Sequence, residues 1–466
     1  MLTEKDFRVK TLGDCMITSP LKYSTIRGDG LVNFVPDNRR IRYYIDYEAP
    51  VYKRETREDG NLSGCPLTFN DEQQTTDDKQ NEFENCSFEK AGPRSMVYFQ
   101  PAQVIAAIMT SGGLCPGLNN VIRSLVMELY YRYGVKKILG IRYGHKGLDP
   151  SFSYEPIELN PAIVSRIHET GGSFIGTSRG TVDKEVMAES LMKYKINILF
   201  GVGGDGSQKG LHQLSEASEK RGLKISFVGI PKTIDNDIPY AYKTFGLSTA
   251  VTIASEATAS AHSEAESAHN GIGLVKLMGR NSGYIAALTT IANNDVNFCL
   301  VPEADFDLDG EGGFLDVLER RLIKRHHAVI VVAEGAGQKY FENETVERDA
   351  SGNVRLKDIG FFLREKIKGY FLKKGIHVDL KYIEPSYMIR SVQADADDSI
   401  YTDSLARNAV HAGMAGKTDV LVGNWYNMLT YVPLSLVVSR KKRLDIEGDI
   451  WRSVLSATGQ PLKMIK

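Results

Sequence analysis

Residues 196–207 read Ile-Asn-Ile-Leu-Phe-Gly-Val-Gly-Gly-Asp-Gly-Ser, an apolar run that ends in a glycine-rich turn. Such a run is typical of a buried strand, and the glycines that follow it mark a turn. Similar apolar runs occupy residues 104–109, 138–141, 225–230, 272–277, 298–301, 328–333 and 419–422. Strands that alternate with helices over this length predict parallel sheets that are covered on both faces.

Helical patterns lie between these runs, at residues 246–267 and 358–374 among others. The second has an apolar face formed by Ile359, Leu363, Ile367, Tyr370 and Phe371, and Val186, Met187, Ser190, Leu191 and Tyr194 mark one face of a further helix. At 466 residues the chain exceeds the size at which one core stops growing, about 250–300 residues. We therefore expect an α/β fold with two Rossmann-like parallel-sheet domains, the active site between them, and an N-terminal extension.

The first hundred residues differ from the rest of the chain in their pattern of apolar and polar residues. Residues 41–47 alternate between apolar and polar side chains, which is typical of a half-buried strand. Residues 71–85 are polar without periodicity, which favours a long loop or a disordered insert. We expect this extension, residues 1–100, to pack on the main body or between subunits, and we find no chemistry in it.

The composition excludes several classes of partner. The formal charge is -1, so no general nucleic-acid or membrane field is expected. Five cysteines lie scattered without metal-ligand spacing, which fits a reducing compartment. The N-terminus has no apolar run long enough for a signal or a membrane span, and the last residues are not a peroxisomal address. We expect a cytoplasmic protein.

Three glycine-rich loops suit phosphate groups. They are Gly112-Gly113, residues 176–180 with Arg179 and Gly180, and residues 203–207. Ligands of open α/β sheets bind at the carboxyl ends of strands, and glycine lets the backbone approach phosphate oxygens. One such loop alone is more often a tight turn, but three in one sheet favour phosphate binding. Asp205 is then the expected Mg²⁺ ligand, and Arg179 the cation for a migrating phosphoryl group.

Residues 231–237 read Pro-Lys-Thr-Ile-Asp-Asn-Asp and follow the strand at 225–230. An isolated Asp-Asn-Asp is commonly a solvated turn. Next to the phosphate loops, one carboxylate can accept the proton of an attacking hydroxyl while its neighbour interacts with the metal ion or holds the loop. Phosphoryl transfer needs little else from a protein beyond alignment and counter-charge.

Later segments offer groups for an acceptor sugar phosphate. Met278-Gly279-Arg280 follows one strand and Glu334 closes another, where its carboxylate could accept sugar hydroxyls. Residues 385–390 read Pro-Ser-Tyr-Met-Ile-Arg, and with Lys381 they offer cations and a phenol for a phosphate dianion. Each also has a structural alternative: a surface ion pair for Arg280, a helix cap for Glu334, or a core position for Tyr387.

With these motifs in this order, the chain resembles the phosphofructokinases from Val104 to about Trp451. The matching segments are residues 110–119, 203–207, 231–237, 278–280, Glu334 and 385–390. The long N-terminal extension and Lys232 make it similar to the ATP-using subgroup, as in trypanosomatids, that is related in sequence to pyrophosphate-dependent enzymes.

The resemblance implies a role for each matching residue. Asp235 is implied as the general base toward the 1-hydroxyl of fructose 6-phosphate, with Arg280, Arg179 and Thr233 as further catalytic groups. The implied nucleotide site consists of Gly112, Arg179, Gly180, Gly204, Asp205, Gly206 and Ser207, with Asp205 on Mg²⁺. The implied sugar-phosphate site consists of Thr233, Ile234, Asp235, Met278, Gly279, Arg280, Glu334, Lys381, Tyr387, Met388, Ile389 and Arg390. Asp237 is implied to support the loop and its metal contacts.

The resemblance also implies an arrangement of domains. Residues 101–246 with 389–440 are expected to bind the nucleotide, and residues 247–388 with 441–466 the sugar phosphate. A homotetramer is implied, and no residue pattern here demonstrates it. One departure stands out, because bacterial members have an arginine near the position of Gly271 that reaches a neighbouring subunit, and this chain has none.

Two residues disagree about the phosphoryl donor. Pyrophosphate-type members resemble Gly-Gly-Asp-Asp, whereas residue 206 here is glycine, which removes both bulk and charge. Lys232 favours pyrophosphate, because pyrophosphate-type members have lysine at this position and ATP-type bacterial members have glycine. A flexible lysine can move its stem, whereas two like charges about 4 Å apart cost roughly 4 kcal/mol at an effective dielectric constant near 20. We therefore predict ATP, with pyrophosphate as the alternative.

Two other functional classes are alternatives to a phosphofructokinase. A non-catalytic regulatory subunit would be expected to lack Asp235, Asp205 or Arg280, and all three are present. A kinase for a nicotinamide nucleotide or a lipid can share Gly-Gly-Asp-Gly, but it would leave residues 278–280 and 385–390 without a role.

Overall fold

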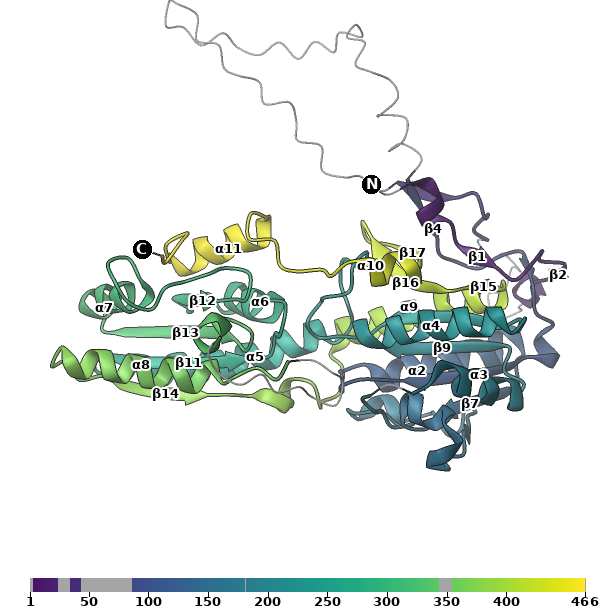
Figure 1. The fold of residues 1–466 in the computed structure, drawn as a ribbon, viewed down its shortest axis with the longest axis horizontal. Helices are drawn as coiled ribbons and strands as arrows, with labels where there is room; N and C mark the ends of the chain where they lie inside the picture. Colours follow the sequence, from purple (N-terminus) through teal and green to yellow (C-terminus); the bar gives the residue numbers. More distant parts are fainter. Residues whose placement is uncertain (1–2, 24–33, 43–85, 181, 343–353, 466) are drawn as a thin grey trace, which may run out of the picture.

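The computed structural model describes residues 3–23, 34–42, 86–180, 182–342 and 354–465. These residues form two lobes that lie side by side, each built on a sheet (Figure 1). In the described chain, the sheet of the first lobe has nine strands in the order β3-β4-β17-β16-β10-β9-β6-β7-β8. Their bounds are β3 Arg40–Arg42, β4 Ser87–Lys90, β17 Met428–Pro433, β16 Val420–Trp425, β10 Ser226–Pro231, β9 Ile198–Gly203, β6 Ile105–Thr110, β7 Lys137–Ile141 and β8 Ile157–Glu158.

The middle of this sheet is parallel and covered on both faces. Strands β16, β10, β9, β6 and β7 run in one direction. At one edge β8 is antiparallel to β7, and at the other β17, β4 and β3 follow β16 in successive antiparallel pairs. Along β9, Ile198 and Phe200 join the core under α2 (Leu118–Met127) and α9 (Ala396–Met414). Leu199 points the other way, toward α3 (Lys184–Lys193) and α4 (Asp205–Lys220). Burial of both faces explains why these strands are apolar at almost every position.

The second lobe repeats the plan with the parallel order β12-β13-β11-β14. The strands are β12 Phe298–Leu300, β13 His327–Ala333, β11 Gly271–Leu277 and β14 Asp379–Ile383. Helices α5 (Leu247–Glu266) and α6 (Tyr284–Asn293) cover one face, and α7 (Phe314–Arg325) and α8 (Ile359–Lys373) cover the other. Four of the five expected apolar residues of α8 are buried, and Tyr370 is packed against that core.

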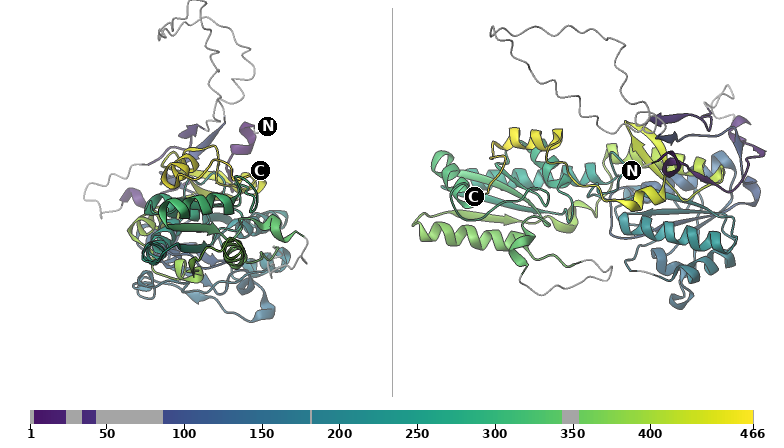
Figure 2. Two further views of the ribbon diagram at one scale, coloured as in Figure 1. Left: turned by 90° about the vertical axis from the view of Figure 1, so that its left-hand side faces the viewer. Right: turned by 45° about the horizontal axis from the view of Figure 1, so that its top comes forward.

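The chain crosses between the lobes three times. It enters the second lobe after β10 and returns through the 3-10 turn η10 (Ser386–Ile389) to α9. After α10 (Leu434–Ser439) it crosses again, so that α11 (Asp449–Thr458) packs on α6 of the second lobe (Figures 1 and 2). We call residues 440–444, at the start of this last crossing, the return segment. The hydrophobic core beside α5 contains side chains from both lobes, so the lobes are joined by packing as well as by chain.

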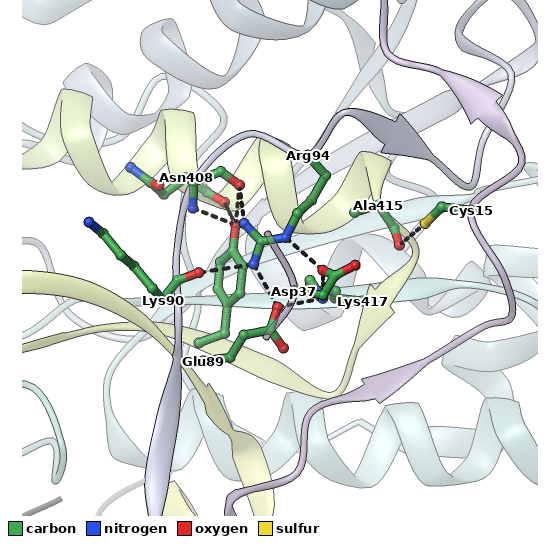
Figure 3. A network of polar contacts seen from close by, with 10 residues as sticks. Cys15, Asp37, Glu89, Lys90, Arg94, Asn408, Ala415 and Lys417 are labelled. Atoms are coloured by element: carbon green, nitrogen blue, oxygen red, sulfur yellow. Dashed lines mark hydrogen bonds and ion pairs between the residues drawn. The ribbon is translucent and has the colours of Figure 1, made fainter. Parts of the chain in front are cut away.

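The described part of the N-terminal extension packs on the first lobe. Strand β1 (Lys10–Thr11) pairs with β15 (Lys417–Thr418), β2 (Ile17–Thr18) with β5 (Met96–Val97), and β4 with β17. An ion cluster holds this region in place, with Arg94, Glu89 and Lys417 buried and Asp37 exposed. Arg94 donates to Glu89 at 2.6 Å and to Asp37 at 2.8 Å, and Lys417 contacts Glu89 at 2.6 Å (Figure 3). The strand expected at 41–47 begins as β3, and its remainder lies outside the described residues, as does the segment 71–85.

The expected two parallel sheets with helices on both faces are confirmed. The seven strands expected from residue 104 to residue 333 are present within two residues of their expected bounds, and the strand expected at 419–422 is β16, which ends three residues later. The domain boundaries given above stay predictions. Among the described helices, none combines the length and apolar character that crossing a membrane would require.

Candidate active site

The site loops meet where the two lobes face each other. Strands β6, β9 and β10 of the first lobe end in residues 111–113, 204–207 and 232–237, and β11 and β13 of the second end in 278–280 and Glu334. Two contacts join the sets directly. Ser282 donates its hydroxyl to the carbonyl of Asp235 at 3.0 Å, and the carboxylate of Glu334 acts electrostatically on that of Asp235.

Cations gather around the glycine pair that follows β6. A Cβ added to Gly112, which has φ of 89°, would lie 3.4 Å from Nζ of Lys232 and 3.6 Å from Oγ of Ser207. A Cβ on Gly113 would lie 3.1 Å from Arg390 and 3.4 Å from Arg179. Three cationic side chains therefore surround a piece of backbone without side chains, which is an arrangement suited to phosphate oxygens.

The second phosphate loop opens helix α4. Gly204 caps the helix, and its carbonyl accepts from the amides of Ser207 and Gln208, both at 2.9 Å. Asp205 begins the helix, where unpaired amides and the helix dipole favour negative ligands. Gly206 is exposed, and a Cβ added there would meet nothing within 4 Å. The position thus has room for a larger side chain.

The loop after β10 is held by its middle residue. Asn236 donates to the carbonyl of Tyr242 at 3.2 Å and accepts from the amide of Thr244 at 3.1 Å. The hydroxyl of Thr244 donates to the carbonyl of Thr233 at 2.6 Å, and Thr233 accepts from the amide of Asp235 at 3.1 Å. Asn236 therefore makes the side-chain contacts that hold the turn. The carboxylates of Asp235 and Asp237 are not needed for these contacts.

The two aspartates of this loop are partly buried and strongly perturbed. Burial is the main cause that raises the pKa of Asp235, and the carboxylates of Asp237 and Glu334 raise it further. Burial also raises the pKa of Asp237, against a hydrogen bond from Thr233, and Asp205 adds to the rise. Among the described residues, Oδ1 of each aspartate has no hydrogen-bond partner.

A divalent cation fits this arrangement. Asp205 and Asp237 come from different loops and are close enough to repel each other, and one oxygen of Asp237 is buried without a partner in the described chain. Carboxylate oxygens are the ligands that Mg²⁺ prefers, usually together with waters and phosphate oxygens.

The guanidinium of Arg390 has a lowered pKa, chiefly because it is buried and also because Arg179 lies close by. Two guanidiniums side by side repel each other, so an anion between them would relieve both. Burial is likewise the main cause that lowers the pKa of Lys232, and Arg390 and Arg179 lower it further. The site is thus divided into a cationic side and a carboxylate side.

Lys232 differs from the flexible lysine expected from the sequence. Its side chain is buried, and Nζ donates to the carbonyl of Gly113 at 2.6 Å. The strand end and the first glycine loop enclose it, so its stem is fixed.

The sugar-phosphate residues are only partly gathered. Arg280 donates to the carbonyl of Val354. Glu334 is partly buried, and burial is the main cause that raises the pKa of its carboxyl group. Arg280, Lys276 and Arg390 oppose this rise. Ile389 is fully buried, so it can offer only backbone to a ligand. Tyr387 and Met388 are 65% and 67% exposed, and Lys381 pairs with Asp379 at 3.2 Å on β14.

The glycine at position 271 has a local cause. It begins β11, at the opposite end from the loop 278–280, and a Cβ there would collide with the carbonyl of Ala265 in α5. A larger residue would push α5 away from the sheet.

The reasoning from sequence missed several residues that contact the site. Ser282 and Thr244 hold the acid–base loop, and Glu303 accepts from the amide of Gly283 at 3.1 Å, at the start of α6. Lys442 of the return segment donates to two carbonyls of the loop after Asp237. No short motif includes these residues together with their partners, which lie from 11 residues away for Thr244 to 200 residues away for Lys442.

Comparison with known proteins agrees with this geometry. Residues 105–413 match the family model described as phosphofructokinase. An ATP-dependent 6-phosphofructokinase of Borreliella burgdorferi is 45% identical over 465 residues, which covers 98% of each chain. An enzyme of the same name from Trypanosoma brucei brucei is 43% identical over 374 residues, 79% of this chain and 76% of that one.

Solved structures show the same fold at lower identity. A pyrophosphate-dependent phosphofructokinase from Marinobacter aquaeolei aligns with a TM-score of 0.62 at 21% identity, over 76% of this chain and 91% of that one. A phosphofructokinase from Pichia pastoris in the T-state aligns with a TM-score of 0.60 at 20% identity, over 76% and 37%. The α/β fold expected from the sequence is therefore confirmed. The resemblance in sequence is confirmed as well, including the likeness to a trypanosome relative, and the chain belongs to the phosphofructokinase family.

Proposed function

We propose that this chain is an ATP-dependent 6-phosphofructokinase of glycolysis, which transfers the γ-phosphate of ATP to the 1-hydroxyl of fructose 6-phosphate and yields fructose 1,6-bisphosphate. The observation that carries the choice of donor is Gly206, next to Asp205 with open space around its Cα. A nucleotide needs room beyond the β-phosphate, and no side chain of residue 206 takes that room. The curated relatives with 43–48% identity are named as ATP-dependent enzymes, which supports the same choice.

Asp235 is the proposed general base. Its carboxylate is the one that Ser282 and Thr233 position through the backbone, and it faces the sugar-phosphate loops of the second lobe. A raised pKa suits a base, because a carboxylate that binds a proton more tightly removes it from a hydroxyl more readily. Asp235 takes the proton as the hydroxyl oxygen attacks, and Asp237 stays on the metal side of the loop.

Asp205, with Asp237 beside it, would hold Mg²⁺. When bound, the ion neutralises charge on the β- and γ-phosphates. The amides at the start of α4 and the glycine backbone at 112 and 113 cradle the phosphates. Thr177 and Ser178 hold the backbone of Gly112. The hydroxyl of Thr177 donates to the carbonyl of Gly112 at 2.8 Å, and the amide of Gly112 donates to the carbonyl of Ser178 at 3.0 Å.

Arg179 is the proposed cation for the migrating phosphoryl group, and Arg390 lies next to it on the side of the acceptor. Charge that develops on the equatorial oxygens in the transition state lies between these guanidiniums, which cannot lose their protons at neutral pH. Arg280 and Glu334 face the sugar, the first toward anionic oxygens and the second toward hydroxyl groups. Lys381, Tyr387 and Met388 stay candidates for the 6-phosphate side.

Pyrophosphate as donor is the second candidate, and Lys232 is the residue that favours it. A coupled assay tests both: purified protein receives fructose 6-phosphate with either ATP or pyrophosphate, and fructose 1,6-bisphosphate is measured. Turnover with ATP alone is expected. Turnover with pyrophosphate alone would overturn the assignment of the donor, and no turnover with either would favour a regulatory subunit.

The assembly and location remain proposals as well. We infer a homotetramer from the family, which sedimentation of the purified chain tests, and we place the enzyme in the cytoplasm.

A further inference from the structure

A cavity lies beside the acid–base loop, and Asn236 of that loop is among its lining residues. It measures about 780 Å³, within the range of roughly 300–1,000 Å³ that is usual for small-molecule sites. Its walls come from the loop after β10, from α5 and α6, and from the return segment. None of the phosphate-loop residues described above lines it.

The lining combines rings with positive charge. Tyr240, Tyr242, Tyr284 and Trp425 supply aromatic surface, and Leu288 and Val251 supply aliphatic surface. The basic side chains Lys243, Arg440, Lys441, Lys442 and Arg443 stand around it, and among the described lining residues none is acidic. Lys243 pairs with Asp397, which lies outside the lining.

Two of these cations already lie over rings. The guanidinium of Arg440 lies 4.3 Å from the ring centre of Tyr240, and Nζ of Lys442 lies 5.1 Å from that of Tyr284. Cations stacked on aromatic faces form a surface that accepts a flat ring and its anionic substituent together. A purely apolar ligand would make no use of the cations in the lining.

Lys442 connects the cavity to the acid–base loop. Its ammonium donates to the carbonyls of Ala241 at 2.7 Å and Tyr242 at 2.9 Å, and its amide donates to the carbonyl of Asp237 at 3.4 Å. Tyr242 also accepts from Asn236, the residue that holds the turn between the two aspartates. Any group that draws the ammonium into the cavity weakens the support of this turn.

We propose that this cavity is a regulatory site for a small organic anion that carries a planar aromatic ring, and that its occupation slows phosphoryl transfer through Lys442. The ring packs between the tyrosines and Trp425, and the anionic group lies among the cations of the return segment. An anion next to Lys442 competes with the carbonyls of Ala241 and Tyr242 for its protons. The effect on turnover rests on the proposed role of Asp235, whereas binding does not.

The experiment uses 8-anilino-1-naphthalenesulfonate, a planar aromatic sulfonate, as the probe on the full chain. Only two tryptophans occur in the sequence, and Trp451 is buried in the core. In a Trp451→Phe background, the fluorescence of Trp425 therefore reports on the cavity. Expected are saturable quenching of Trp425 and a lower kcat with unchanged KM for ATP, because the probe does not enter the phosphate loops.

Two variants locate the binding. Arg440→Glu with Lys441→Glu reverses charge, and Val251→Phe fills the space while leaving the cations in place. Each is expected to weaken binding at least about tenfold, which corresponds to about 1.4 kcal/mol of binding free energy. Lys324→Glu with Arg325→Glu, at the exposed end of α7, makes the same change of net charge and is expected to bind as the parent does.

Other outcomes would overturn the proposal. Binding that both cavity variants leave intact, or inhibition that ATP relieves, would place the probe in the active site. Quenching that depends on protein concentration and changes the oligomeric state in light scattering would mean that a second copy of the chain covers this face. Because the probe is followed by fluorescence, a protein without ATP turnover would refute the proposed function and still report on the cavity.

Discussion

The ammonium of Lys232 donates to the carbonyl of Gly113 at 2.6 Å, which ties the loop after β10 to the loop after β6. Gly112 and Gly113 lie at the centre of the cations, so this bond fixes the backbone that faces the phosphates. The lysine therefore has a structural role within the site whichever donor is used. That role explains how a lysine at 232 and a glycine at 206 can occur together in an ATP-using enzyme.

Gly206→Asp is expected to reduce kcat/KM for ATP by about a thousandfold, since two like charges about 4 Å apart cost roughly 4 kcal/mol at an effective dielectric constant near 20. The added side chain has space, so folding should be unaffected. Binding of fructose 6-phosphate should stay within a few-fold. Steady-state kinetics with each substrate varied in turn measure this.

Gly206→Asn is the matched control, because it has nearly the shape of aspartate without the charge. It should keep far more ATP turnover than Gly206→Asp. Equal losses in the two variants would mean that bulk and not charge decides, and full ATP turnover by Gly206→Asp would remove the reason for assigning ATP.

Asp235→Asn is expected to lower kcat by about 10²–10⁴-fold with a modest change of KM, because a general base acts in the transition state. The amide keeps the shape of the side chain and cannot take a proton. Asp237→Asn serves for comparison and should act through the dependence of the rate on Mg²⁺ concentration. Normal turnover by Asp235→Asn would exclude it as the base.

The acidic limb of the pH–rate profile should lie above the range of an ordinary aspartate, because burial, Asp237 and Glu334 all raise the pKa of Asp235. As pH falls through this raised pKa, the base becomes protonated and kcat declines. Glu334→Gln removes one of the repelling charges, so it should move the limb to lower pH. A limb that stays in place would show that Glu334 does not act on the base, whatever the variant does to KM.

Lys442→Met is expected to lower kcat severalfold with little change of KM for ATP, since it removes two hydrogen bonds that hold residues 241 and 242. Lys442→Arg can donate to the same carbonyls and should recover most of the rate. Lys441→Met changes the neighbouring, exposed lysine and should leave kcat unchanged. If Lys442→Met and Lys442→Arg lose the same activity, the hydrogen bonds do not position the loop.

The ion cluster of the N-terminal extension should make a large contribution to stability. Glu89 is buried and accepts from Arg94 and Lys417, so Glu89→Gln leaves two buried cations with less counter-charge and should cost about 3–5 kcal/mol of unfolding free energy (Figure 3). Arg166→Ala, which breaks an exposed pair with Glu169, should leave the free energy of unfolding almost unchanged. Urea unfolding measures both. Similar small losses would mean that Asp37 alone compensates the two cations.

The strands that the sequence revealed are those buried on both faces. In β9 and β10 every residue is buried, so their apolar runs stand out. Strand β14 was missed because its five residues are exposed or half-buried and include Asp379 and Lys381. Strand β17 was missed although four of its six residues are buried; it is the antiparallel partner of β16 and begins with the exposed Met428. Half-buried strands carry a weaker apolar signal.

In the site, short-range motifs could be predicted and long-range support could not. Glycines and carboxylates after strands mark residues 203–207 and 231–237 because the parallel topology brings strand ends together. Lys442 lies 200 residues from Tyr242 in the chain, so the sequence around Lys442 does not predict this hydrogen bond. The buried, fixed position of Lys232 also depends on β6 and β9 closing around it.

The pairing of β4 with β17 has one more consequence. Thr430 and Tyr431 of β17 pair with Lys90 and Glu89, so residues of the N-terminal extension cover the edge that β17 would otherwise present. An uncapped strand edge is a template for joining one molecule to the next. Removal of the first hundred residues would expose the edge of β17 to neighbouring molecules, which β4 covers in the intact chain.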